Sequence, residues 1–372
     1  MKNNKGITLV ALVVTIVVLL ILAGVSINLV LGNNGIIAKA KSAETKSAEA
    51  SQNDLKGMNG LVSEMEGALA GNGSTGSGSG NGNTGSGNNF VTKNTEVTYP
   101  GGNVWIPEGF KISKDSASTV QGGVVIEDKD GNQFVWVPVA TLADYKRTWY
   151  AGNDSFSIYS EALPEDEKTS VERYKGFYIG RYEAGDKEST GTTKATFRTR
   201  SSGADNAVTI KADKVPYNYV TRAQAISLAE GFKDKQGYKA TTKLVSSYAW
   251  DTTIAFIEKT VNNYGSSSPQ GNYLDTSVTY KDITDENKSE KTKAENSSLL
   301  VATGQTTPVC NIYDMGGNVA EWTTESYSTT IIPYAVRGGT YYDGFARYPA
   351  GHRNGSSGNA NEHDGFRLTL FM

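Results

Sequence analysis

Few residues in this sequence could take part in covalent or redox chemistry. Cys310 is the only cysteine among 372 residues, which excludes intramolecular disulfides, thiolate zinc clusters and two-cysteine redox chemistry. Its neighbours Val309 and Ile312 are apolar, so we expect a buried, unreactive thiol. The two histidines, His352 and His363, lie eleven residues apart in a Gly/Asn/Ser-rich stretch and indicate no nucleophile with an adjacent base, although a His–His metal pair remains an alternative.

Two acidic residues have the spacing of a hard-cation site. Asp314 and Glu321 flank the Gly-Gly-Asn turn at 316–318. Carboxylate oxygens together with backbone carbonyls of such a turn are ligands that suit Ca²⁺. The alternative is that both carboxylates accept hydrogen bonds from loop amides, and the spacing alone leaves both interpretations open.

The segment 341–364 has the composition of a binding surface. It reads YYDGFARYPAGHRNGSSGNANEHD and contains both histidines of the chain. Aromatic contact area combined with adaptable hydrogen-bonding residues is typical of antibody paratopes. We therefore expect this segment to bind a protein or glycan ligand, the alternative being an irregular surface loop with some buried tyrosines. The expected contact residues are Tyr341, Tyr342, Asp343, Phe345, Tyr348, His352, Arg353, Asn354, Asn359, Asn361 and His363.

The elements that must position these residues belong to residues 90–372. Short β-type runs such as Phe134–Pro138 and Phe177–Ile179 alternate with turn clusters and predict strands. Residues 262–298 are mostly polar and predict a long loop. Strands of irregular length with few helices indicate an α+β domain.

Two helices are predicted within this domain. Thr221 and Gln224 have the spacing of a capping box ahead of a helical apolar pattern. A second amphipathic pattern over 248–259 follows Ser246 and Ser247, either of which could be the N-cap. Both helices precede the candidate binding segment in the chain.

Three ordered motifs identify a family resemblance. They are NIYDMGGNVAEW at 311–322, VRGGT at 336–340 and DGFRL at 364–368. Together they resemble the formylglycine-generating-enzyme, or sulfatase-modifying-factor, domain family. The resemblance covers 90–372 and implies a variant of the C-type lectin fold.

The resemblance also bears on chemistry. The family's oxidase uses a copper-thiolate reaction that needs two cysteines after the R-G-G block, and those places hold Asp343 and Tyr348 here. We therefore expect no copper and no catalysis of that kind, while an extracellular enzyme with a non-cysteine site remains an alternative. By residue matching, the resemblance implies a structural Ca²⁺ held by the side chains of Asp314 and Glu321 and by the backbone carbonyls of Gly317 and Val319.

The two motifs that flank the binding segment carry a second family resemblance. A fixed R-G-G-T entrance and a fixed G-F-R-L exit enclose varied polar and aromatic positions. This arrangement is similar to that of the variable proteins of diversity-generating retroelements. It implies that residues 341–364 differ between copies of the gene.

The N-terminal part of the chain predicts a membrane anchor. Residues 7–31 carry no charge and would form a helix of about 37 Å, enough for a bilayer core of about 30 Å. Lys2 and Lys5 in the leader 1–6 place the leader in the cytoplasm and the rest of the chain outside. A cleaved secretory signal and an uncleaved single-pass anchor are the alternatives.

The leader resembles a class III type IV prepilin signal. The resemblance implies that a prepilin peptidase cuts between Gly6 and Ile7 and leaves the helix in place. Ala11 stands where pilins carry the glutamate that pairs with a neighbouring subunit, which argues against efficient assembly with pilin subunits.

A stalk and a tether connect the anchor to the head. Residues 32–70 are rich in Ala, Lys, Glu and Ser and predict an exposed helical stalk. Residues 71–89 include eight glycines in nineteen positions and predict a flexible linker with a reach of roughly 25 Å. The head, 90–372, follows this domain boundary.

The charge and the organisation together suggest a role. With 36 basic and 39 acidic residues the net charge is −3, so nucleic acid is not an expected partner. We expect a protein of the bacterial cell envelope that displays a non-catalytic binding head outside the cell. The alternatives to this binding role are the extracellular enzyme with a non-cysteine site and a structural pilus subunit.

Overall fold

The computed structural model describes the head of the chain. The leader, the predicted membrane helix, the Gly6–Ile7 junction, the stalk and all of the linker except Asn89 lie outside the described residues. Among the residues that are described, no helix is both long and apolar enough to span a membrane. The described residues are 89–150, 159–187, 208–267, 269–283, 287, 289–327 and 330–372.

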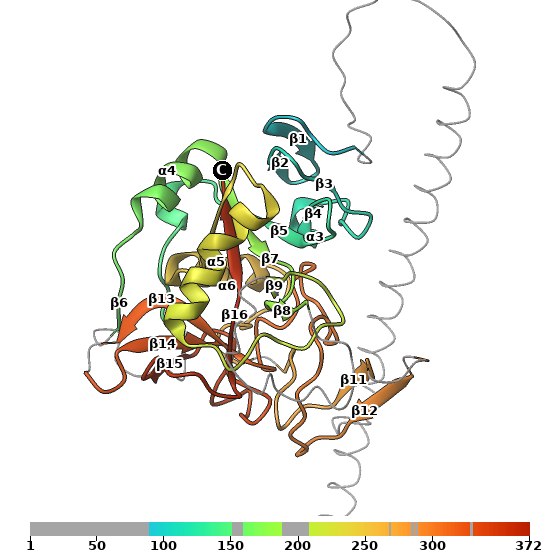
Figure 1. The fold of residues 1–372 in the computed structure, drawn as a ribbon, viewed down its shortest axis with the longest axis vertical. Helices are drawn as coiled ribbons and strands as arrows, with labels where there is room; N and C mark the ends of the chain where they lie inside the picture. Colours follow the sequence, from blue (N-terminus) through green and yellow to red (C-terminus); the bar gives the residue numbers. More distant parts are fainter. Residues whose placement is uncertain are drawn as a thin grey trace, which may run out of the picture. The chain divides into compact units, whose positions relative to one another are not determined.

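A six-stranded antiparallel sheet forms the centre of the head (Figure 1). The C-terminal strand lies inside this sheet, between two strands that come much earlier in the chain. In spatial order the strands are β10 (Thr241–Leu244), β17 (Leu368–Phe371), β7 (Gly176–Gly180), β5 (Gln133–Pro138), β4 (Val125–Glu127) and β3 (Lys111–Ile112).

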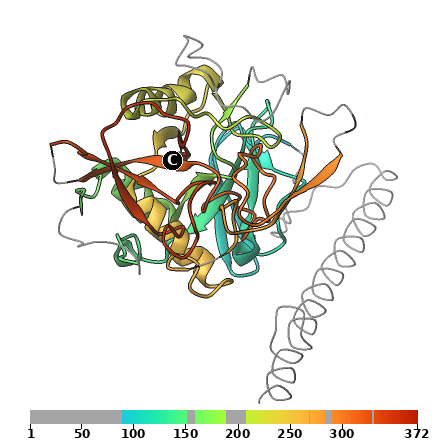
Figure 2. The same ribbon diagram turned by 90° about the horizontal axis from the view of Figure 1, so that it is seen from below.

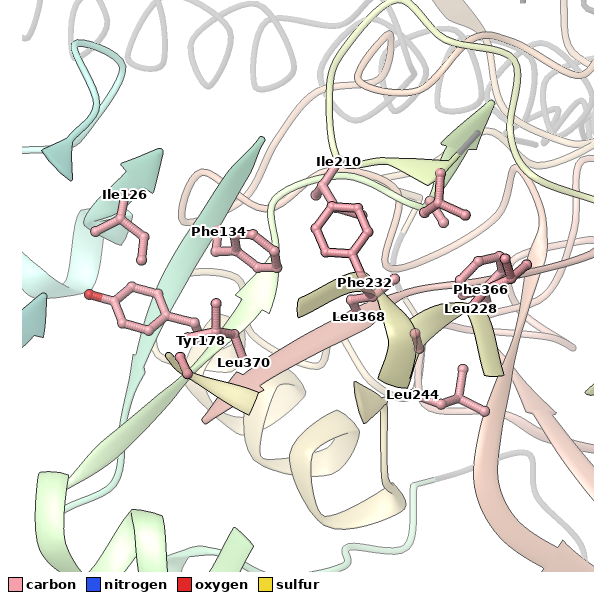
Figure 3. Packing of buried hydrophobic residues seen from close by; sticks show 14 of the residues in the cluster. Ile126, Phe134, Tyr178, Ile210, Leu228, Phe232, Leu244, Phe366, Leu368 and Leu370 are labelled. Carbon is pink, nitrogen blue, oxygen red and sulfur yellow. The ribbon is translucent and has the colours of Figure 1, made fainter. Parts of the chain in front are cut away.

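Both faces of this sheet are buried. Successive side chains of a strand point to opposite faces, and in β5 Phe134 and Trp136 join one apolar cluster while Val135 and Val137 join another. Figure 3 shows the first cluster, where Phe134 packs among residues of other strands and of a helix. Burial on both faces explains why central strands such as β5 and β7 are apolar at successive positions.

Helices cover the two faces. α5 (Arg222–Gln236) contributes Leu228 and Phe232 to the first cluster, and α6 (Ser247–Glu258) contributes Trp250 and Ile254 to the second. α4 (Glu165–Tyr174), which the sequence reading missed, packs against β7 and β17.

The two predicted helix starts are confirmed. Thr221 Oγ1 accepts a hydrogen bond from Gln224 N at 3.2 Å, and Gln224 Oε1 accepts one from Thr221 N at 3.0 Å, which is a complete capping box. At α6 the N-cap is Ser246, whose hydroxyl accepts a hydrogen bond from Ala249 N at 3.1 Å.

A second sheet carries the candidate binding segment. Its central strand β13 (Ala320–Tyr327) pairs antiparallel with β14 (Tyr334–Arg337) and parallel with β16 (Asp364–Phe366). Outside β14 lies β15 (Arg353–Ser356), and β6 (Tyr159–Ser160) pairs with the far end of β13. The chain between β14 and β16 therefore starts from one neighbour of β13 and ends at its other neighbour.

The expected long loop at 262–298 is wrong in part. β11 (Val278–Lys281) and β12 (Glu290–Lys293) form a hairpin there, which projects from the head (Figures 1 and 2). Its buried end explains the difference, because Lys293 Nζ donates to the carbonyls of Tyr273 and Thr276 at 2.6 and 2.7 Å. A hydrogen-bonded lysine anchors a hairpin that has little apolar surface.

The remaining elements are short. Two further two-stranded ribbons and two single-turn helices complete the described head. They are β1 (Thr95–Tyr99) with β2 (Gly102–Ile106), β8 (Gly185–Asp186) with β9 (Val208–Thr209), α3 (Val120–Gly123) and η1 (Leu142–Asp144).

Candidate ligand-binding site

The segment 341–364 folds around a cavity of about 330 Å³ at the second sheet. Ala320 of β13 and Val336 of β14 form part of its wall, and residues of β15 and of the loops before and after it complete it. Seven of the eleven expected contact residues line this cavity: Tyr342, Asp343, Tyr348, His352, Asn354, Asn361 and His363. Residues distant in the sequence therefore converge here, and we call this cavity the loop pocket.

The other four expected contact residues lie elsewhere. Tyr341 is only 1 % exposed and packs with Leu300 and Val319, so its assignment as a surface contact is wrong. Phe345 is half-buried beside Tyr273, with ring centroids 6.4 Å apart. Asn359 is exposed and its side chain donates to Ser357.

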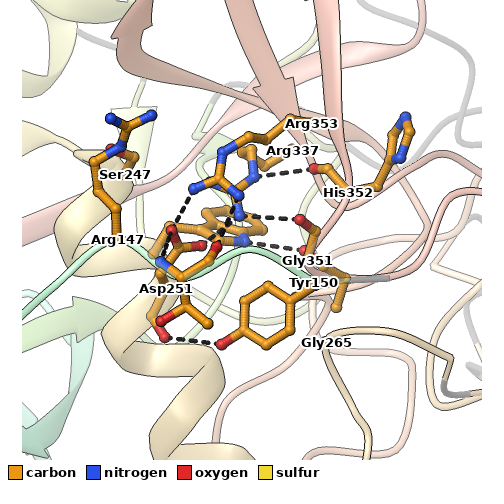
Figure 4. A network of polar contacts seen from close by, with 12 residues as sticks. Arg147, Tyr150, Ser247, Asp251, Gly265, Arg337, Gly351, His352 and Arg353 are labelled. Atoms are coloured by element: carbon orange, nitrogen blue, oxygen red, sulfur yellow. Dashed lines mark hydrogen bonds and ion pairs between the residues drawn. The ribbon is translucent and has the colours of Figure 1, made fainter. Parts of the chain in front are cut away.

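Arg353, the fourth of these residues, belongs to a buried ion-pair network (Figure 4). Its Nε lies 3.0 Å from both carboxylate oxygens of Glu325, and its guanidinium also pairs with Asp251 of α6. Arg337 Nη2 lies 2.5 Å from Asp251 Oδ1, and Arg147 pairs with Glu325 at 2.5 Å. Arg353 is therefore a structural residue, and its assignment as a ligand contact is wrong.

The strand register explains which side chains reach the pocket. Arg337 and Arg353 are partners across β14 and β15, and both enter the network. The next pair, Val336 and Asn354, lies on the opposite face and lines the loop pocket. The network thus holds the two strands whose other face forms the pocket wall.

Two edge-to-face aromatic pairs lie on the pocket wall. The rings of Tyr342 and His363 have centroids 4.8 Å apart at 89°, and those of Tyr348 and His352 have centroids 4.8 Å apart at 82°. Figure 4 shows the ring of His352 pointing away from the ion-pair network while its carbonyl accepts from Arg337. Tyr342 is 47 % exposed, so its ring is available to a ligand.

Local turns fix the polar groups of the pocket. Asp343 Oδ2 accepts hydrogen bonds from Thr340 N and Oγ1 at 2.9 and 2.8 Å. Asn361 Nδ2 donates to Asp364 Oδ2 at 2.7 Å, while Asn361 Oδ1 accepts from His363 N and Asp364 N. Such side-chain-to-backbone bonds hold a loop in one conformation without regular secondary structure.

The sequence reading missed Asp364 as a pocket residue. It is 6 % exposed, and burial raises its pKa to about 6, with the negative charge of Asp343 adding to the effect. The signal was the N-x-x-D spacing from Asn361, which is typical of an Asn side chain that caps a turn.

The two carboxylates among the proposed calcium ligands already have protein partners. Arg367 pairs with Glu321, its Nε lying 3.0 Å from both carboxylate oxygens. Asp314 accepts hydrogen bonds from Thr306 Oγ1 at 2.5 Å and from Gly304 N at 2.9 Å. Because Arg367 already binds both oxygens of Glu321, this carboxylate as arranged has its counter-charge and does not favour Ca²⁺, and the calcium site stays a prediction.

Glu183 makes the same region still more acidic. It is fully buried, and burial together with the charges of Asp314 and Glu321 raises its pKa well above the usual range. Its carboxylate accepts hydrogen bonds from Asn318 Nδ2 and Val319 N. In the described part of the chain no cluster of three or more His, Cys, Asp or Glu side chains has the arrangement of a metal site.

The single cysteine is buried, as predicted. Cys310 is 8 % exposed, and burial raises the pKa of its thiol. Its sulfur lies 3.4 Å from Thr260 Oγ1 and 3.5 Å from Gln121 Nε2.

Residues 86–370 match the model of the sulfatase-modifying factor enzyme 1-like domain, FGE-sulfatase. The chain belongs to this family. Its fold is thus the family's variant of the C-type lectin fold, as the resemblance of the three motifs predicted.

Solved structures similar to this FGE-sulfatase chain share little of its sequence. Treponema denticola variable protein 1 is 13 % identical, with a TM-score of 0.38 over 65 % of this chain and 96 % of that one. PvdO from Pseudomonas aeruginosa is 16 % identical, with a TM-score of 0.38 over 67 % and 98 %, and CarF is 18 % identical, with a TM-score of 0.31 over 53 % and 87 %. No curated protein matches the chain.

Proposed function

We propose that this FGE-sulfatase chain is a non-catalytic binding protein that contacts its target through the loop pocket and its rim. The observation that carries the proposal is the convergence of seven expected contact residues on one cavity. Side chains of mixed aromatic and polar type in a concave site are what ligand recognition requires.

The chemistry of the pocket supports binding rather than the family's oxidase reaction. Asp343 and Tyr348, which stand where the resemblance places the two catalytic cysteines, both line the pocket. Neither side chain supplies the thiolate that such copper chemistry uses. In this proposal the place of the oxidase site has become a ligand site.

We place the head outside a bacterial cell, joined through stalk and linker to a helix in the membrane. The support is the uncharged segment 7–31 and the basic leader before it. In the same proposal, a prepilin peptidase processes Gly6–Ile7 and the loop 341–364 varies between gene copies. N-terminal sequencing of the protein purified from cell envelopes tests the first, and a near-copy of the loop sequence beside a reverse transcriptase gene tests the second.

The binding role is tested on cells that display the full chain. Tyr342→Ala and Asn354→Ala remove two exposed pocket residues outside the buried network. We expect the double variant to lose adhesion to the natural target by at least about tenfold, since exposed aromatic residues often anchor interfaces. The control variant Tyr280→Ala lies on the projecting hairpin and should adhere normally. Unchanged adhesion of the pocket variant would contradict the proposal.

A further inference from the structure

The loop pocket contains two carboxylates and no basic side chain other than histidine. Asp343 and Asp364 both line it, and no lysine or arginine does. Their hydrogen-bond donors are neutral, namely Thr340 for Asp343 and Asn361 for Asp364. Over the described ranges no ion pair joins either carboxylate to a lysine or arginine.

This arrangement leaves the negative charge of the two carboxylates without a counter-charge. Two buried carboxylates elsewhere in the head have guanidinium partners, Glu325 in Arg353 and Glu321 in Arg367. Glu183 and Asp314 are buried with neutral donors, but neither of them lines the loop pocket. Asp364 is 6 % exposed and feels the charge of Asp343 as repulsion. A cation placed between the two carboxylates would relieve both the desolvation and the repulsion.

The walls of the pocket suit the same kind of ligand. Tyr342 and Tyr348 lie on them, each held edge-to-face by a histidine ring. The face of an aromatic ring attracts a cation, most strongly where water is excluded. The guanidinium of Arg347 already lies 5.2 Å from the centroid of the Tyr348 ring, so the Tyr342 ring is the one that we expect to meet a ligand cation. The volume of about 330 Å³ is at the small end of ligand pockets, which favours a single side chain over an extended chain of sugars.

We propose that the loop pocket takes the cationic end of a lysine or arginine side chain presented by a protein partner. Asp343 and Asp364 supply the counter-charges, and Tyr342 and Tyr348 supply the walls around the aliphatic stem. This inference rests on the proposed binding function and adds the chemical class of the ligand.

The direct test titrates small probes onto the purified full chain. The probes are Nα-acetyl-lysine methylamide, its arginine counterpart, the neutral Nε-acetylated lysine analogue and glucosamine, measured by calorimetry at about pH 8, where carboxylates are ionised. We expect both basic amino-acid probes to bind and the Nε-acetylated analogue to bind at least about tenfold more weakly. Equal binding of the acetylated analogue, or no binding of the basic probes at millimolar concentration, would overturn the inference. Preferential binding of glucosamine would replace the protein partner with an amino sugar and so overturn it as well.

Variants assign the effect to the two carboxylates. Asp343→Asn with Asp364→Asn keeps the size and one acceptor oxygen of each side chain while removing both charges, and should weaken the basic probes at least about tenfold. Asp234→Asn, an exposed carboxylate of α5, is the matched control and should change nothing. Asp343→Asn alone is the second variant, since Asp343 is only half-buried and its loss of charge leaves β16 untouched. Unchanged affinity in both Asp343 variants would contradict the inference.

The two proposals fail in different ways. Target adhesion that survives the double Asn variant but is lost in Tyr342→Ala with Asn354→Ala would retain the binding function and reject the cationic ligand. Adhesion that survives both would reject the binding function itself.

Discussion

Arg367 and Glu321 form a bidentate ion pair in the interior of the head. Arg367 Nε lies 3.0 Å from both carboxylate oxygens and Arg367 Nη2 lies 2.7 Å from Oε1, with both side chains inaccessible to solvent. The same guanidinium donates to the carbonyls of Gly180, Tyr313 and Asp314. One side chain from the C-terminal motif therefore joins β7, the 313–314 turn and β13.

Removing this guanidinium should strongly destabilise the head. Arg367→Met leaves Glu321 buried without a counter-charge, which we expect to lower the free energy of unfolding by about 3–5 kcal/mol. Urea unfolding followed by tryptophan fluorescence measures the change. Arg173→Met, an exposed arginine of α4, should cost less than about 0.5 kcal/mol. Similar losses in the two variants would contradict this interpretation.

Calcium should not stabilise the head. Because Arg367 already pairs with Glu321, added Ca²⁺ or EGTA should leave the melting temperature of the full chain unchanged. Differential scanning fluorimetry measures it, with magnesium as the control ion. A calcium-specific rise would show that a site forms in spite of the ion pair.

The neighbouring tyrosines 341 and 342 should respond differently to truncation. Tyr341→Ala opens a cavity beside Leu300 and Val319 and should cost about 3–5 kcal/mol of stability, as for other buried aromatic residues. Tyr342→Ala removes a ring that is 47 % exposed and should cost less than about 1 kcal/mol while adhesion falls. Chemical denaturation of both variants, paired with the adhesion assay, distinguishes stability from binding. A large stability loss in Tyr342→Ala would remove the basis for using it as a binding probe.

The buried carboxyl of Asp364 should make stability depend on pH. Its pKa is raised to about 6 in the folded head, above the value of an exposed aspartate, so the folded state binds the proton more tightly. This group's contribution is full below about pH 4, the ordinary pKa of an exposed aspartate, and is lost as the pH rises through about 6. Asp364→Asn should therefore gain about 1–3 kcal/mol relative to the parent between about pH 4 and pH 8. Urea unfolding of both proteins at the two pH values gives the difference, and a constant difference would contradict the prediction.

Cys310 should resist thiol reagents in the folded protein. Burial and a raised thiol pKa both reduce the thiolate available for reaction. We expect slow reaction with a disulfide reagent in buffer and rapid, stoichiometric reaction in urea, measured by absorbance. Fast labelling of the native protein would indicate local opening around Gln121 and Thr260.

Local sequence signals predicted several of the elements. The capping box at Thr221 and the apolar run at Phe134–Pro138 depend on neighbours in the chain, and both predictions are confirmed. The buried position of Arg353 could not be predicted in this way, since its partners Asp251 and Glu325 come from α6 and β13. The composition of a loop indicates that it can bind a ligand. Which of its residues are accessible depends on the face of the strand on which each side chain lies and on its partners from other elements.

The same distinction applies to the calcium expectation. Asp314 and Glu321 are close in sequence and have the right chemistry, but the side chain that neutralises Glu321 lies near the C-terminus of the chain. Spacing can suggest ligands, and only the three-dimensional arrangement shows that Arg367 pairs with Glu321.

β14 and β16 lie on either side of β13, and the segment between them begins and ends beside this one strand. This geometry makes the head a suitable scaffold for engineered binders. Both ends of the intervening segment are fixed by backbone pairing to one strand, so side chains on the pocket rim can be randomised without moving the frame. A library would vary Tyr342, Tyr348 and Asn354 while keeping Tyr341 and Arg353 constant, because the last two belong to the interior.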